Sequence, residues 1–129
     1  VVSAYLLDTN ALYWVMTNDP AMGPATRARL AGASSVYYSA ASVWELEIKR
    51  LRGKLGNARP FDRIARSTGL LELPVTAEHA RAIGQTVVPH HDPFDRLLLT
   101  QATVEGLLFV TADRTLLGLG RADVLDARR

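Results

Sequence analysis

The sequence of 129 residues contains no cysteine. Disulfide bonds and thiolate metal sites are therefore excluded, and we expect a cytoplasmic protein because thiol-free composition fits a reducing compartment. Hydrophobic residues make up 48% of the chain and charged residues 22%. These fractions are ordinary for a globular domain that is built around one core.

Long apolar runs are also missing. No segment approaches the roughly 20 apolar residues of a transmembrane helix, so we expect no membrane span. The N-terminus has no basic region before a long apolar stretch, and we expect no signal peptide. Internal repeats, linkers and low-complexity segments are absent from the sequence. We therefore expect one domain over residues 1–129.

The charge is small but unevenly distributed. The formal net charge is +2 and the sequence pI is about 9.3. Seven of the fifteen Lys and Arg residues fall in one short region: Lys49, Arg50, Arg52, Lys54, Arg59, Arg63 and Arg66. Such a patch could bind phosphates, but a charge run taken alone more often marks the solvated face of a helix.

Strands alternate with helices along the chain. Apolar segments at residues 4–7, 35–39, 70–75, 107–111 and 122–127 predict strands. Helical spacing and stop signals predict helices at residues 10–16, 25–32, 41–52, 61–69, 76–86, 92–106 and 114–120. Thr76 and Asp92 are predicted N-caps, and Pro93 occupies the first helical position. This alternation predicts an α/β fold with a parallel sheet of four to five strands and helices on both faces.

Four acidic residues are predicted to meet at one edge of this sheet. Asp8 ends the first strand, and Asp113 lies just beyond the fourth. Glu45 and Asp95 lie near the beginnings of two helices, and helices in such folds begin at the carboxyl edge of the sheet. Ligands bind at this edge in parallel α/β sheets. We therefore expect the four carboxylates to converge.

Each acid also has a purely structural interpretation. Asp8 and Asp113 could cap the helices that follow them, Asp95 could close a capping box, and Glu45 could be solvated. Four carboxylates at one point would repel one another, however, unless a cation lay among them. Oxygen ligands favour a hard divalent ion, Mg²⁺ or Mn²⁺, which can activate water for attack on a phosphodiester.

Four segments resemble the motifs of the PIN-domain nucleases and, among them, the VapC-type toxins of prokaryotic toxin–antitoxin pairs. They are "LLDTNALYW", "SAASVWELEIK", "HHDPFDRLLLTQA" and "FVTADRTL". Matched motif by motif, Asp8, Glu45 and Asp95 resemble the metal ligands, and Asp113 resembles the last, often outer, acid. The third segment is the most specific, and the likeness covers nearly the whole chain.

The resemblance implies a three-layer α/β/α sandwich and Mg²⁺- or Mn²⁺-dependent endoribonuclease activity. It also implies a homodimer and a cognate VapB-type antitoxin. In the family the antitoxin wraps the toxin's helices, which would involve residues 14–30 and 44–55 here. Related toxins cut transfer, ribosomal or messenger RNA, and the sequence does not select among these targets.

Several further residues are candidates for supporting roles at the site. The resemblance makes Asn10 a polar contact at the site. Asp92 is first a helix cap and second a minor metal contact, and Arg96 could bind a substrate phosphate or, as we favour, pair with an acid. Thr111 is predicted to support the site by hydrogen bonding to an acid or to water.

The histidines and tryptophans are weaker candidates for a role at the site. His90 and His91 are expected to be structural or at the surface. Trp14 and Trp44 could stack on a base, although packing in the core or against a partner is the more common role of such residues.

Other protein classes fit the sequence less well. A DNA nuclease or a phosphatase would use similar metal chemistry. A haloacid-dehalogenase-type phosphatase needs an acid where Asn10 stands, and a receiver domain needs an acidic pair at the first strand and an Asp ending the third. A non-catalytic binding module with a PIN fold would be expected to lack one of the four acids, and none is missing.

Overall fold

The computed structural model describes residues 3–55, 60–86 and 92–129. The strands are β1 (Ala4–Leu7), β2 (Ser35–Ser39), β3 (Leu71–Leu73), β4 (Leu108–Thr111) and β5 (Val124–Asp126). The helices are α1 (Thr9–Thr17), α2 (Pro24–Ala31), α3 (Ala40–Leu51), α4 (Phe61–Ser67), α5 (Ala77–Ala82), α6 (Pro93–Glu105) and α7 (Arg114–Leu117), with a 3-10 turn η1 (Ile83–Gln85). Among the described residues, no helix is long and apolar enough to cross a membrane.

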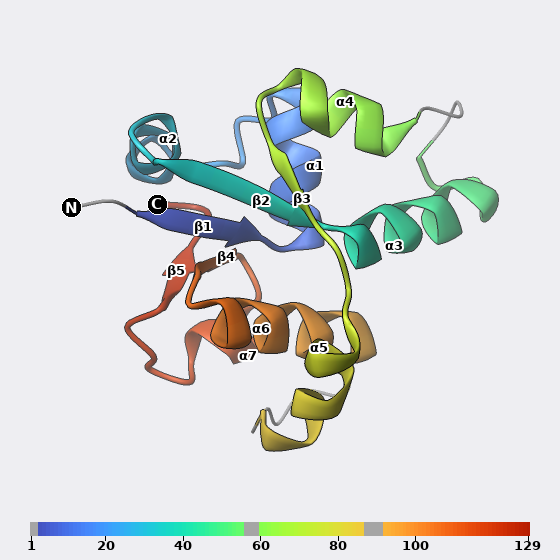
Figure 1. Cartoon of the computed structure of the whole chain (residues 1–129). Helices are drawn as coiled ribbons and strands as arrows, with labels where there is room; N and C mark the ends of the chain where they lie inside the picture. Colours follow the sequence, from blue (N-terminus) through green and yellow to red (C-terminus); the bar gives the residue numbers. More distant parts are fainter. Residues whose placement is uncertain (1–2, 56–59, 87–91) are drawn as a thin grey trace.

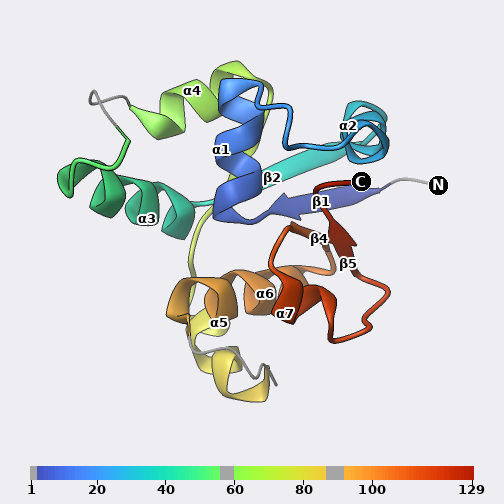
Figure 2. The same ribbon diagram turned by 180° about the vertical axis from the view of Figure 1, so that it is seen from behind.

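The five strands form one parallel sheet in the order β3-β2-β1-β4-β5. In the central strand, Leu6 pairs with Tyr37 of β2 on one side and with Phe109 of β4 on the other. Helices cover both faces: α1, α2 and α4 lie on one side, and α5, α6 and α7 lie on the other (Figures 1 and 2). The predicted α/β fold with a parallel sheet and an α/β/α arrangement is confirmed.

The central strand serves two hydrophobic cores because successive side chains of a strand point to opposite faces. Tyr5 and Leu7 pack into the cluster beneath α1 and α4, and Leu6 packs into the cluster beneath α6. All three are at most 4% exposed. A strand buried on both faces reads as a continuous apolar run, which is what residues 4–7 are.

The strand order places the carboxyl ends of β1 and β4 side by side at a change of direction. From β1 the chain moves outward through β2 to β3, then returns across the sheet to β4 and continues to β5. The helices switch from one face to the other at the same step (Figure 1). A crevice opens at such a switch point, outside the strand ends, and this is where ligands bind in open α/β sheets.

Small departures from the predicted elements have local causes. The helix predicted at 76–86 becomes 3-10 after Ala82, because Gly84 disfavours continued α-helix. The predicted third strand ends at Leu73, since Pro74 cannot donate a ladder hydrogen bond. Helix α1 begins one residue early because Asp8 caps it.

Candidate active site

The four predicted acids lie around the switch point. Asp8 directly follows β1 and is 3% exposed, and Asp113 lies two residues beyond β4. Glu45 is in the second turn of α3, and Asp95 is in the first turn of α6. Asp95 interacts electrostatically with all three of the others. The structure thus brings the four charges into one neighbourhood, as the sequence predicts.

Asp8 is held by hydrogen bonds to both carboxylate oxygens. The backbone N–H of Ala11 donates to Oδ1 at 2.7 Å, and the Thr111 hydroxyl donates to Oδ2 at 2.6 Å. Burial raises the pKa of the Asp8 carboxyl from 3.8 to about 6, although these two hydrogen bonds oppose the rise. The neighbouring charges of Glu45 and Asp113 raise it further. Asp8 is therefore a carboxylate whose negative charge is poorly stabilised by the protein alone.

Thr111 joins two of the acids. Its hydroxyl donates to Asp8 and accepts the backbone N–H of Asp113 at 3.0 Å. Thr111 is fully buried, so this geometry is fixed by the surrounding packing. The predicted hydrogen bond between Thr111 and a site acid is present in the structure.

Glu45 is held by contacts that the sequence did not indicate. The buried Thr9 hydroxyl donates to Glu45 Oε1 at 2.6 Å and lies 2.9 Å from the buried Ser42 hydroxyl. On the next turn of α3, Lys49 Nζ lies 3.7 Å from Glu45 Oε2. The one signal in the sequence is a hydroxyl residue directly after Asp8, and nothing nearby relates it to a residue 36 positions later.

Asp95 owes its position to the start of α6. The Asp92 side chain caps this helix by accepting from the N–H groups of Phe94 at 2.9 Å and Asp95 at 3.4 Å, and Pro93 follows at the first helical position. Burial raises the pKa of Asp95 to about 7, and the charge of Asp92 raises it further, followed by those of the other site acids. A second carboxylate is therefore reluctant to ionise in this neighbourhood.

The capping interpretations are also correct for three acids. Asp8 caps α1, Asp92 caps α6, and Asp113 caps α7 through the N–H groups of Thr115 at 2.8 Å and Leu116 at 3.1 Å. Capping and a functional role do not exclude each other here. The caps fix where each carboxylate lies, since helices begin at the edge of the sheet where the site is.

The donor chemistry fits a hard divalent cation. The cluster offers carboxylate oxygens. Burial first, and the neighbouring negative charges second, raise the pKa values of Asp8 and Asp95, and a bound cation would oppose both effects. The described residues nevertheless contain no group of three or more Asp, Glu or His side chains arranged to hold an ion as they stand.

Of the remaining residues that the sequence singled out for supporting roles, the structure describes Asn10 and Arg96. Asn10 is exposed in the first turn of α1, and its contact role stays a prediction. Arg96 donates from Nη2 to the Thr86 carbonyl at 3.4 Å, and the favoured ion pair with an acid is not seen among the described residues. His90 and His91 lie outside the described residues.

The predicted basic patch divides into paired and unpaired cations, and Arg59 lies outside the described residues. Arg50 pairs with Glu47 at 2.8 Å, and Arg66 pairs with Asp62 at 2.8 Å. Together with Lys49, half of the six described cations therefore have an acidic neighbour on their own helix. The other three are exposed, with no acidic partner in the described part of the chain: Arg52, Lys54 and Arg63.

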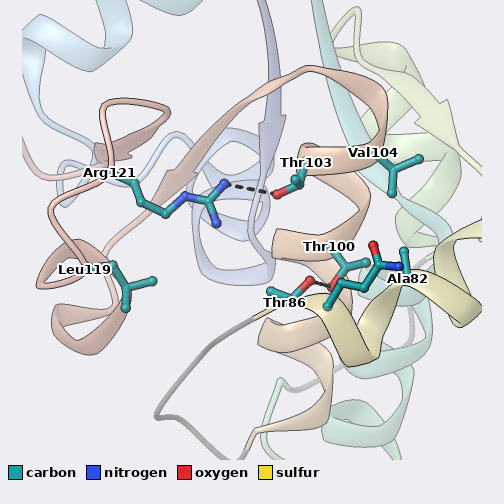
Figure 3. A pocket seen from close by; sticks show the side chains of 8 residues that line it. Ala82, Thr86, Thr100, Thr103, Val104, Leu119 and Arg121 are labelled. Atoms are coloured by element: carbon teal, nitrogen blue, oxygen red, sulfur yellow. Dashed lines mark hydrogen bonds between the residues drawn. The ribbon is translucent and has the colours of Figure 1, made fainter.

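A separate hollow lies beside α6. It has a volume of about 460 Å³ and is enclosed by η1, α6 and the segment after α7 (Figure 3). Arg121 enters it and donates to Thr103 at 3.1 Å, but its charge is neutralised by Asp123 at 2.7 Å. None of the four site acids lines it, so we place the candidate site at the sheet edge.

Comparisons with known proteins agree with the fold. A family model for the PIN domain matches residues 5–121. Three solved structures are similar: VapBC2 from Rickettsia felis bound to a promoter DNA fragment, a toxin–antitoxin complex from Klebsiella pneumoniae, and VapC20 from Mycobacterium tuberculosis, described as a sarcin–ricin loop cleaving toxin. No curated protein sequence matches.

The structural likeness extends over nearly the whole of each chain. The Rickettsia structure is 14% identical with a TM-score of 0.63, and the match covers 95% of this chain and 96% of that one. The Klebsiella structure is 17% identical with a TM-score of 0.64, covering 94% and 95%. The Mycobacterium structure is 16% identical with a TM-score of 0.55, covering 94% and 98%. At these identities the likeness concerns the fold.

Proposed function

The chain belongs to the PIN-domain family, and from this premise we propose that it is a metal-dependent endoribonuclease, the toxin of a toxin–antitoxin pair. The resemblance drawn from the sequence is confirmed at the family level. One observation carries the proposal: Asp8, Glu45, Asp95 and Asp113 gather at the switch point between β1 and β4. Hydrolysis of a phosphodiester with a carboxylate-held metal is the chemistry that such a cluster supports best.

The four carboxylates are the proposed ligands of Mg²⁺ or Mn²⁺. When bound, such an ion lowers the pKa of a water molecule and neutralises charge on the scissile phosphate. The protein's own part is positioning. Thr111 holds Asp8 and the backbone of Asp113 in one arrangement, and Thr9 holds Glu45. These hydrogen bonds at the carboxyl edge of the sheet thus fix the positions of these acids.

A VapB-type antitoxin is the proposed partner, and a homodimer is the proposed assembly. The Klebsiella structure supports the first because it is a toxin–antitoxin complex of similar fold. A further support is a hollow of about 440 Å³ between α1, α2 and the segment after α4, whose lining of mixed polarity includes Val15, Met22 and Leu30. These three lining residues fall within residues 14–30, where the resemblance puts antitoxin contacts. Since the proposed substrate is cellular RNA, the proposal also implies a cytoplasmic protein.

The test is RNA cleavage by purified protein from which any antitoxin has been removed. Total cellular RNA is incubated with Mg²⁺, Mn²⁺ or EDTA, beside the Asp8→Asn variant. We expect discrete fragments that require both the metal and Asp8, and sequencing of their ends gives the target. A sarcin–ricin loop fragment belongs in the same assay, because the Mycobacterium relative is described as cleaving that loop.

The same experiment separates the competing functions. Metal-dependent cleavage of single-stranded DNA but not of RNA would replace the proposal with a DNA nuclease. No cleavage of either, together with metal binding that is unchanged by Asp8→Asn, would favour a non-catalytic binding module.

A further inference from the structure

Helix α3 exposes a tryptophan beside the carboxylate cluster. Trp44 is 64% exposed and directly precedes Glu45. Tryptophan is highly buried on average, so an indole this open to solvent calls for an explanation. The structure excludes packing in the core, which the sequence left possible for this residue. Figure 1 shows that α3 leaves the sheet at its carboxyl edge and extends beyond it, so the helix borders the candidate site.

A second aromatic ring braces this tryptophan. The rings of Trp44 and Phe94 meet edge to face, with centroids 5.3 Å apart and an interplanar angle of 68°. Phe94 belongs to α6 and directly precedes Asp95. Each ring thus belongs to the residue that directly precedes a site acid in the sequence, and the ring contact bridges the two helices that carry Glu45 and Asp95. Edge-to-face contact restrains the indole while leaving most of its surface open.

Cations suited to a phosphate backbone lie on the same helix and just beyond its end. Lys49 lies one turn from Glu45, and Arg52 and Lys54 are exposed beyond it. Proteins that bind single-stranded nucleic acid combine a positively charged track with aromatic side chains on which bases stack. An exposed indole, together with cations on and just beyond the helix that carries Glu45, supplies that combination beside the proposed site.

We propose that Trp44, braced by Phe94, stacks on one unpaired nucleobase of a single-stranded nucleic acid and so sets which phosphate reaches the carboxylates. This inference rests on the proposed function and names a feature of its substrate: the nucleotide beside the scissile bond is unpaired. Stacking does not read hydrogen-bonding edges, so Trp44 positions the strand and tolerates any base.

Leu51 supplies the matched control. It is 73% exposed and lies seven residues after Trp44, on the same face of α3. If this face is instead a contact between protein chains, Leu51 and Trp44 should matter together. If it is a base platform, only the aromatic residue should matter.

Binding is measured in an Asp8→Asn, Trp14→Phe background, which does not cleave and leaves Trp44 as the sole tryptophan. The probe is a short single-stranded oligoribonucleotide, compared with its duplex and with a version carrying abasic positions. We expect the single strand to quench Trp44 fluorescence and the other two to quench it less. Trp44→Ala, followed by anisotropy of a labelled strand, should weaken binding about 10- to 100-fold, whereas Leu51→Ala should leave it unchanged.

Three results would overturn the inference. The first is an absence of Trp44 quenching by the single strand, and the second is an unchanged affinity of Trp44→Ala for the strand. The third is an equal loss of affinity in Trp44→Ala and Leu51→Ala, together with a lower protein mass measured by sedimentation. The last would assign the face to a second copy of the chain. The outcomes are separable from those of the cleavage assay, because metal-dependent cleavage without quenching rejects only the stacking, and quenching without cleavage rejects only the nuclease.

Discussion

At the scale of single residues, Asp8 combines its proposed role as a metal ligand with a cost to stability. It is almost fully buried, and its charge is opposed both by burial and by neighbouring acids. A carboxyl whose pKa is raised on folding stabilises the folded state less as pH rises, because the unfolded chain releases its proton first. For Asp8 this loss develops between about pH 4 and the folded pKa of about 6.

Asp8→Asn should therefore stabilise the protein at neutral pH while abolishing metal-dependent cleavage. The amide keeps an acceptor for the Ala11 N–H and can donate to the Thr111 hydroxyl. The difference between a pKa of about 6 and 3.8 corresponds to at most about 3 kcal/mol. We expect a gain of about 1–3 kcal/mol in the free energy of unfolding at pH 7.5 in EDTA, measured by urea titration, and almost none at pH 4.

Asp123 is the natural control because its pKa is shifted the other way. Its hydrogen bond with the Arg121 guanidinium lowers the pKa of the Asp123 carboxyl. Asp123→Asn should slightly destabilise the protein at neutral pH. If Asp8→Asn lowered the free energy of unfolding to a similar degree, the charge of Asp8 would not destabilise the folded protein at neutral pH.

We propose that the Thr111 hydroxyl is a positioning group, and it can be removed with little change in side-chain shape. Thr111→Val should lower kcat/KM about 10- to 100-fold, because Asp8 loses the hydrogen bond that orients it. Thr111→Ser should restore most of the activity. Thr115→Val alters an exposed residue of α7 and should have no effect. Activity that tracked thermal stability across these variants, and not the presence of the hydroxyl, would assign Thr111 a structural role only.

At the scale of elements, the C-terminal end of α3 and helix α4 present cations that lack acidic partners among the described residues. Arg52→Glu combined with Arg63→Glu should raise KM for RNA with little change in kcat, and should reduce the salt dependence of binding. Arg81→Glu, on the exposed face of α5, is the control. An unchanged salt dependence in the double variant would mean that Arg52 and Arg63 are solvated surface residues that do not contact the RNA backbone.

The elements show which features a sequence can predict. The caps at Asp92 and Thr76, the Pro93 position and the apolar run of β1 are local signals, and the structure confirms them. The four acids could be assigned to one edge because parallel strands share the direction of their carboxyl ends. Local signals were therefore sufficient to predict the strands and helices that position the four acids.

Contacts between distant elements could not be predicted in this way. Thr9 with Glu45 is one such contact, and the buried hydrogen bond from Ser39 to Gln101 at 2.6 Å, between the start of α3 and α6, is another. Both depend on how two helices sit across the sheet, which no spacing within a helix encodes. The sequence could not decide whether Trp44 is buried or exposed for the same reason, because helical spacing assigns a residue to a face of its helix but does not say what that face contacts.

At the scale of the molecule, the site exists only when the whole chain is folded. Asp8 comes from the first strand, Glu45 from the third helix, and Asp95 and Asp113 from either side of β4. Mutual repulsion among these acids opposes folding, and a bound cation would remove it. Metal binding and global stability should therefore be linked.

Mn²⁺ should accordingly raise the unfolding temperature, and should do so more at pH 7.5 than at pH 5.5. At the lower pH, the carboxyls of Asp8 and Asp95, with pKa values of about 6 and 7, retain protons that compete with the metal. An ion at a hundred times its Kd should add about 2.7 kcal/mol, measured by differential scanning fluorimetry against EDTA. Asp8→Asn should lose most of this response while remaining folded. A metal response of equal size at both pH values, or one that survives Asp8→Asn, would mean that the ion binds elsewhere and that these four carboxylates are not its ligands.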